Sequence, residues 1–108
     1  ALGQVMNLFH DQFDLLVTPT LAVPAFDAGQ LDPEGDDDPL RWLRWTPFSY
    51  PFNMTGQPAA TVPCGFTADG LPVGLHIVGP MHRDDLVLRA ARAFEAASPQ
   101  NMRPTFAD

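Results

Sequence analysis

The sequence contains no lysine, a single cysteine and no long apolar run, and each shortage excludes a class of protein. Cys64 alone cannot form a disulfide or a cysteine-based zinc site within the chain, and it fits a reducing, cytoplasmic location. No stretch approaches the ~18 apolar residues of a membrane-spanning helix, so we predict no membrane contact. The six basic residues, all arginine, and the net charge of −7 argue against nucleic acid as a partner.

The composition nevertheless indicates a folded chain. A length of 108 residues fits one domain at most, and 45% hydrophobic residues are too many for a disordered chain. The sequence begins at Ala1 and enters a helical pattern without a capping residue, so we expect a truncated start. We treat residues 1–108 as a single segment.

Hydrophobic spacing predicts an α/β fold in which helices flank strands of a larger mixed sheet. Apolar residues recur at helical intervals over residues 2–12, which predicts an amphipathic helix packed on the core. The stripe consists of Leu2, Val5, Met6, Phe9 and Phe13. Residues 13–18 form an apolar run that Pro19 closes, which predicts a strand covered on both faces.

A long connection follows, and residues 27–40 within it are predicted to be an acidic surface loop. Clustered carboxylates are calcium ligands, but their spacing here does not match an EF-hand and no closing glutamate follows. Trp42 and Trp45 then alternate with arginines. They form either a stacking patch or part of the core with the charges at its edge.

Thr46 and Pro47 are typical of a helix start, as N-cap and first helical residue. Pro51 is expected to limit this helix to about one turn, since proline disrupts a helix interior. Gly56 suits the left-handed position at its end. Strands are predicted over residues 59–65 and 73–78, joined by a turn at Asp69-Gly70.

This turn would pair Cys64 with Leu75 and His76 with Pro63, which places Cys64 and His76 on opposite faces, although a one-residue slip would reverse this. They are the only nucleophile and base that could pair, and a small buried hydrophobe is the favoured interpretation of Cys64. The histidines show no paired-ligand spacing. We predict no metal site and no cofactor.

The last helix is predicted over residues 83–97, with Asp84 and Asp85 in its first turn. Asp85 and Arg89 have the spacing of an ion pair on one helix face. The apolar face consists of Leu86, Val87, Ala90, Ala91, Ala93, Phe94 and Ala97. Residues 98–108 are predicted to be a tail.

The stretch from Thr46 to Pro80 resembles the C-terminal signature of the amidase signature family. It reads TPFSYPFNMTGQPAATVPCGF and continues TADGLPVGLHIVGP. Residues 14–20, DLLVTPT, resemble a further strand of that family. These enzymes are serine hydrolases that cleave amides, and they include the glutamyl-tRNA amidotransferase A subunits. The resemblance covers residues 13–97.

The resemblance implies catalysis by a serine nucleophile, a second serine and a lysine, with a Gly/Ser-rich oxyanion loop. This chain has no lysine and only Ser49 and Ser98, so no catalytic residue is carried over. Leu43 stands where glutamine-accepting relatives tend to have aspartate, which makes glutamine a poor substrate. His76 stands where glutamine is usual. The resemblance implies seven substrate-pocket residues: Thr18, Pro19, Thr20, Trp45, Phe48, Phe52 and Asn53.

The sequence thus predicts the C-terminal segment of an amidase, inactive alone, which supplies sheet strands and a pocket wall. Its partners would be the N-terminal remainder of the enzyme and a small-molecule amide. The alternative is a free-standing, non-catalytic binding or assembly module, with Trp42, Trp45 and Phe48 as its interaction patch. Exposed sheet edges would favour self-association in either case.

Overall fold

The structure is a computed structural model that describes residues 1–34 and 39–98. The described residues form both helices and strands, as the α/β expectation requires. These elements are α1 (Leu2–His10), β1 (Leu16–Pro19), α2 (Arg41–Trp45), α3 (Tyr50–Thr55), β2 (Ala59–Phe66), β3 (Pro72–Val78) and α4 (Asp84–Ala97), with α2 directly followed by α3 and β2 by β3. The predicted tail lies outside the described residues except for Ser98, as do Asp36 to Asp38 of the acidic loop.

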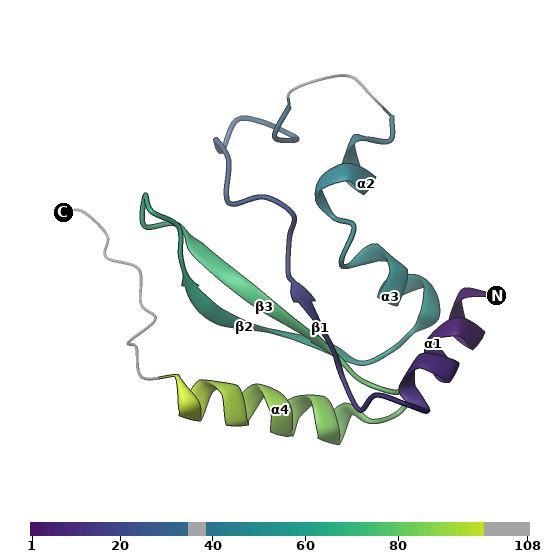
Figure 1. Cartoon of the computed structure of the whole chain (residues 1–108). Helices are drawn as coiled ribbons and strands as arrows, with labels where there is room; N and C mark the ends of the chain where they lie inside the picture. Colours follow the sequence, from purple (N-terminus) through teal and green to yellow (C-terminus); the bar gives the residue numbers. More distant parts are fainter. Residues whose placement is uncertain (35–38, 99–108) are drawn as a thin grey trace.

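The strands form one antiparallel sheet in the order β1-β3-β2, so the last strand in sequence lies in the middle. Helix α4 lies along one face of the sheet, and α3 lies on the other side (Figure 1). The α/β class with helices on both sides is therefore confirmed.

The hydrophobic core lies between α4 and the sheet. Val62 of β2 and Ile77 of β3 pack against Val87 and Ala91 of α4, and all four are buried. Gly79, directly after β3, allows the close approach of α4, because a Cβ there would lie 2.6 Å from Val87 Cγ2. Alternation along β2 and β3 and the helical repeat of α4 thus converge on one apolar layer.

Two expectations about burial in the N-terminal part are wrong for the described chain. Strand β1 is an edge strand and not a strand covered on both faces, since Val17 is 52% exposed. Helix α1 buries no residue, although α3 contacts it. Two residues of its apolar stripe are more than half exposed, Val5 at 59% and Phe13 at 54%.

The predicted helix start at Thr46 and Pro47 is also wrong. Residues 41–45 already form α2, and the Thr46 N–H and hydroxyl both donate to the Trp42 carbonyl, so Thr46 ends that helix. Helix α3 begins at Tyr50, where Pro51 occupies the first turn and needs no N–H partner. Gly56 ends α3 in the predicted left-handed conformation, at φ 74°.

The hairpin register differs from the predicted one. Leu75 pairs with Val62, and His76 pairs with Thr61, because Cys64 is an extra residue in a β-bulge and the connecting loop runs over residues 67–71. The Thr67 hydroxyl accepts a hydrogen bond from Leu71 N–H within that loop. Cys64 is exposed and not buried, with its Sγ 3.6 Å from the Val73 carbonyl oxygen.

Helix α4 matches its predicted range, but the ion pair in its first turn has a different partner. Arg83 Nε donates to Asp85 Oδ1 at 2.8 Å, so Asp85 pairs with the residue before the helix and not with Arg89. The hydrogen bond from Arg83 lowers the pKa of Asp85 and raises that of Arg83. Both groups face water, and the pair adds little to stability.

Candidate functional site

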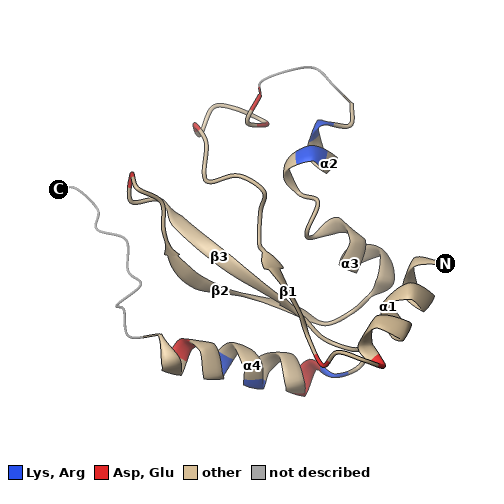
Figure 2. Ribbon diagram, viewed as in Figure 1, with Lys and Arg blue, Asp and Glu red and all other residues tan. Residues whose placement is uncertain are grey.

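The sheet face opposite α4 carries the candidate site, and it is free of charged side chains. Figure 2 shows arginine and acidic residues on α4, on α2 and in the loops, while the three strands are uncharged. The strands therefore offer no charged side chain that could pair with an ionic ligand.

A groove of about 490 Å³ opens on this face, between the segment that follows β1 and the far half of the β2–β3 hairpin. Its lining is almost entirely aliphatic. It consists of Pro19, Thr20, Leu21, Val23, Pro24, Ala25, Thr61, Pro63, Pro72, Val73 and Gly74. This size and character are typical of pockets that bind small apolar molecules.

Two hydroxyl groups are the side-chain polar groups of the groove. Thr20 Oγ1 donates to Thr61 Oγ1 at 3.4 Å, and this hydrogen bond joins the segment after β1 to β2. Glycine at position 74 makes room for this pair, since a Cβ there would lie 2.5 Å from Thr20 Oγ1 and 2.8 Å from Thr61 Cγ2. The Thr20 N–H donates to the Gly74 carbonyl and fixes the segment to β3.

His76 lies further along the same face, on β3, and is only 7% exposed. Thr18 Oγ1 donates to the Pro19 carbonyl at 2.9 Å and lies 3.3 Å from His76 Nδ1. Because a hydroxyl has one proton, Thr18 must accept from His76, which assigns the Nδ1–H tautomer. Burial lowers the pKa of His76, and the Phe52 ring packs 5.6 Å from the imidazole, centre to centre. Burial therefore favours the neutral form of the imidazole.

Trp45 supports the groove wall from behind. Its carbonyl accepts a hydrogen bond from Ala22 N–H at 3.3 Å, and its ring meets Phe26 edge-on at 5.3 Å between centroids. Val23 lies between the groove and a small cavity of about 70 Å³ beside Trp45. The wall at residues 21–25 is therefore anchored to α2.

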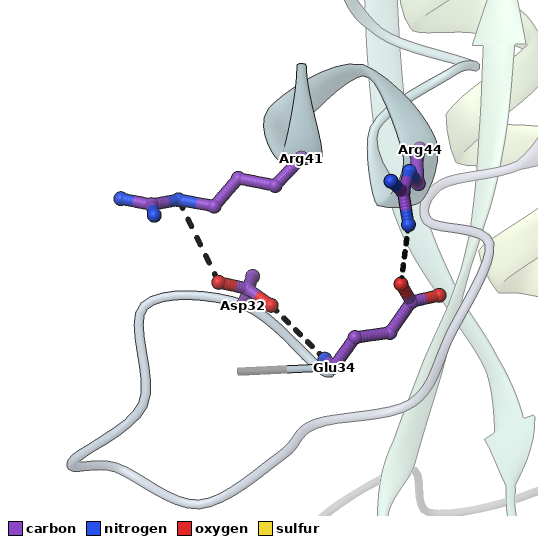
Figure 3. A network of polar contacts seen from close by, with 4 residues as sticks. All are labelled: Asp32, Glu34, Arg41 and Arg44. Carbon is purple, nitrogen blue, oxygen red and sulfur yellow. Dashed lines mark hydrogen bonds and ion pairs between the residues drawn. The ribbon is translucent and has the colours of Figure 1, made fainter. Parts of the chain in front are cut away.

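A pair of ionic contacts ties the following loop to α2 (Figure 3). Asp32 is buried, with one carboxylate oxygen 3.6 Å from Arg41 Nε and the other accepting from Glu34 N–H at 3.0 Å. Arg44 Nη1 donates to Glu34 Oε2 at 2.5 Å. Asp32 thus has a structural role in a segment that composition alone predicts to be a surface loop.

The structure distributes the seven predicted pocket residues over this region. Pro19 and Thr20 line the groove, Thr18 and Phe52 contact His76, and Trp45 lies behind the wall. Phe48 is half-buried and Asn53 is exposed. Sequence reasoning missed Thr61 and Gly74 as groove residues. Gly74 meets Thr20 through the pairing of β1 with β3, and Thr61 is placed beside Thr20 by a β2–β3 register that includes the bulge at Cys64.

Within residues 1–34 and 39–98, no group of three or more His, Cys, Asp or Glu side chains is placed to hold a metal ion. None of the helices in the same ranges is long and apolar enough to cross a membrane.

Comparison with known proteins places the chain among amidases. The family model described as Amidase matches residues 2–88. The acylamidase of Rhodococcus erythropolis is 50% identical over 94 residues, which are 84% of this chain and 20% of that protein. The solved A subunit of the glutamyl-tRNA(Gln) amidotransferase of Thermotoga maritima covers 92% of this chain at 38% identity, with a TM-score of 0.78, and the match spans 21% of that subunit.

A solved bacterial aryl acylamidase of the amidase signature enzymes is 40% identical, with a TM-score of 0.73, and covers 92% of this chain. The match again spans only 21% of the larger protein. The chain thus has about a fifth of the length of the relatives it matches, and it corresponds to one segment of their fold. From the family model, the relatives and the shared fold it follows that the chain belongs to the amidase signature family.

Proposed function

We propose that this chain is the C-terminal segment of an amidase-signature hydrolase, which converts a carboxamide to a carboxylate and ammonia or an amine. One observation carries the proposal: the chain is 50% identical to an acylamidase over most of its own length, yet spans 20% of that enzyme. The segment supplies sheet strands and a pocket wall. It lacks the lysine that the family's mechanism requires, so it is inactive alone.

The pocket wall is the part of this proposal that involves named residues. Thr18, Pro19, Thr20, Trp45, Phe48, Phe52 and Asn53 contribute to the substrate pocket of the complete enzyme. Support comes from the groove at Pro19 and Thr20, and from the anchoring of its wall by Trp45. Their side chains shape and desolvate the pocket, while the nucleophile and the base come from the larger part of the enzyme.

A chimera tests the proposed function directly. In the Rhodococcus acylamidase, the matching segment is replaced by this chain, and ammonia release from primary amides is measured. We expect activity from the chimera, none from the acylamidase with the segment deleted, and none from the 108-residue chain. A folded but inactive chimera would contradict the proposed role, and ammonia release by the isolated chain would contradict its inactivity.

The remainder of the enzyme is the proposed partner, in the cytoplasm, and it covers the outer side of α1. Leu2, Val5 and Leu8 are 42%, 59% and 65% exposed on this helix. Sedimentation of the isolated chain should therefore show self-association that increases with concentration, and a monomer at all concentrations would argue against a missing partner.

A further inference from the structure

We propose that His76 is a positioning residue for the amidase reaction: its imidazole holds the end of β1, and with it one wall of the groove, through Thr18. This inference rests on the proposed amidase function. His76 does not line the groove, so it acts through its neighbours and not on the substrate. The inference is carried by a row of side chains across the sheet and by the burial of the imidazole.

A row of polar side chains crosses the sheet at His76. Thr18 of β1 and Thr61 of β2 are both paired with His76 of the central strand, one on each side. The neighbouring Ile77 points into the core beneath α4, so alternation along β3 directs His76 to the opposite face, which carries the groove. Paired residues share a face, so Thr18 and Thr61 lie there too. His76 is therefore next to both of the strands that pair with β3 and contribute to the groove.

Hydrogen bonds connect His76 to the groove wall. His76 Nδ1–H donates to Thr18 Oγ1, with 3.3 Å between the two atoms, and Thr18 Oγ1 donates to the Pro19 carbonyl at 2.9 Å. Thr20 follows and is joined to β3 by the hydrogen bond from its N–H to the Gly74 carbonyl at 3.0 Å. Pro19 and Thr20 both line the groove. A change in the orientation of Thr18 would therefore move the peptide that leads into the groove wall.

His76 can fix Thr18 because the imidazole itself is confined. It is 7% exposed, and the Phe52 ring of α3 packs 5.6 Å from it, centre to centre. Over residues 1–34 and 39–98, Thr18 is its one hydrogen-bond partner. His76→Leu keeps a branched side chain of similar size without a donor, whereas His76→Asn keeps an N–H on the γ carbon, where histidine carries Nδ1. These two variants separate the shape of the side chain from its hydrogen bond.

Protonation of His76 should loosen this arrangement. Burial lowers the pKa of His76, so a charged imidazole must regain water that the folded site does not provide. No countercharge faces it from the described strands and α3: β1 has no titratable side chain, and those of β2 and α3, Cys64 and Tyr50, are exposed. The charged residues of α4 lie on the other side of the sheet (Figure 2). The strand end should therefore loosen as the pH falls from 6.5, and His76→Asn should abolish this dependence.

Amide hydrogen exchange in the 108-residue chain measures the strand end without any turnover. The reporter is Thr20 N–H, and Ala91 N–H in α4 reports opening of the core. We expect protection of Thr20 to fall roughly two- to tenfold in His76→Leu, the effect of losing one hydrogen bond, and to recover in His76→Asn. Thr18→Val should give the same fall, while protection of Ala91 should change less. His82→Asn is the control, since His82 is exposed and asparagine tolerates its φ of 62°.

The chimera with the Rhodococcus acylamidase measures the consequence for the reaction. His76→Leu should raise KM for primary amides roughly two- to tenfold with little change in kcat, because a displaced wall weakens binding of substrate and transition state alike. His76→Asn should restore KM. It should also remove the rise in KM that the unsubstituted chimera shows as the pH falls from 6.5, whereas His82→Asn should retain that rise.

Several results would overturn the inference. They are an Nε2–H tautomer of His76 in the nitrogen NMR spectrum of the unsubstituted chain, unchanged Thr20 protection in His76→Leu or Thr18→Val, an equal fall at Thr20 and Ala91, or no recovery in His76→Asn. A fall in kcat with unchanged KM would do the same. An inactive chimera would contradict the proposed function, whereas the exchange measurements would still show whether His76 holds the strand end.

Discussion

Replacing Gly79 with alanine should destabilise the chain through a single contact with α4. The new Cβ would lie 2.6 Å from Val87 Cγ2, whereas carbon atoms pack at ~3.5–4.0 Å, so the helix or the strand must move by about 1 Å. Val87 is 2% exposed, and its β-branched side chain has one strongly preferred rotamer in a helix, so it cannot rotate away. Overpacking of this kind costs about 1–3 kcal/mol, which corresponds to a fall of roughly 4–24 °C in Tm.

A double-mutant cycle identifies the contact responsible. Val87→Ala alone should cost about 1–3 kcal/mol, because it removes two buried methyl groups. It also creates the space that the methyl group introduced by Gly79→Ala needs, so the double variant should be more stable than the sum of the two costs by about 1 kcal/mol or more. Free energies of unfolding come from urea denaturation followed by circular dichroism.

Gly29→Ala is the control, since a Cβ at Gly29 would have no atom within 4 Å and its stability should change by less than ~0.5 kcal/mol. Equal stability of Gly79→Ala and this control, or additivity of the two core substitutions within ~0.5 kcal/mol, would refute the reasoning.

Three further substitutions and one chemical reaction test the site, the loop and the hairpin. Burial lowers the pKa of His76 below its ordinary 6.5, so the folded state binds the proton less readily than the unfolded state. The free energy of unfolding should therefore decrease as the pH falls from 6.5, the ordinary pKa, toward the lower pKa of His76 in the folded state. His76→Gln should make the free energy of unfolding depend less on pH, as measured by urea denaturation at a series of pH values. Asp32→Asn should cost about 1–3 kcal/mol, because it weakens a buried acceptor. Glu34→Gln should cost under ~1 kcal/mol, since its ion pair is exposed, and equal thermal shifts for the two would contradict the assigned roles. Cys64 should react with a thiol-specific chromogenic reagent in the folded chain nearly as fast as in urea, and protection would contradict its exposure.

The sequence predicted the elements whose signals are local. Periodicity identified α4, and the turn at Asp69-Gly70 separated two runs that are β2 and β3 in the structure. Gly56 marked the end of α3, because only a residue tolerant of positive φ suits that position. The start of α3 was misplaced for a local reason as well. Thr46 and Pro47 carry a start signal, but Thr46 completes the hydrogen bonds of the preceding short helix.

The groove could be predicted only in part, because it depends on long-range register. The resemblance pointed to Pro19 and Thr20, which line it. The position of Thr61 beside Thr20 depends on a β2–β3 register that includes the bulge at Cys64. Pro63 and Gly65 are typical of a bulge, but they do not by themselves fix which residues pair. The burial of Asp32 was not predicted either, because it depends on a contact with Arg41, which lies nine residues later on α2.

The sheet order has a consequence for how the chain acquires its structure. β3 lies between β1 and β2, so neither neighbour has its partner until residue 78 has been synthesised. The β2–β3 hairpin closes a short loop, whereas Leu16 must find Val78 across most of the chain. We expect the hairpin to form first and β1 to join last, as local contacts form faster than distant ones. Lengthening the connection after β1 should slow this last step only slightly, because doubling a flexible loop costs about 0.6 kcal/mol.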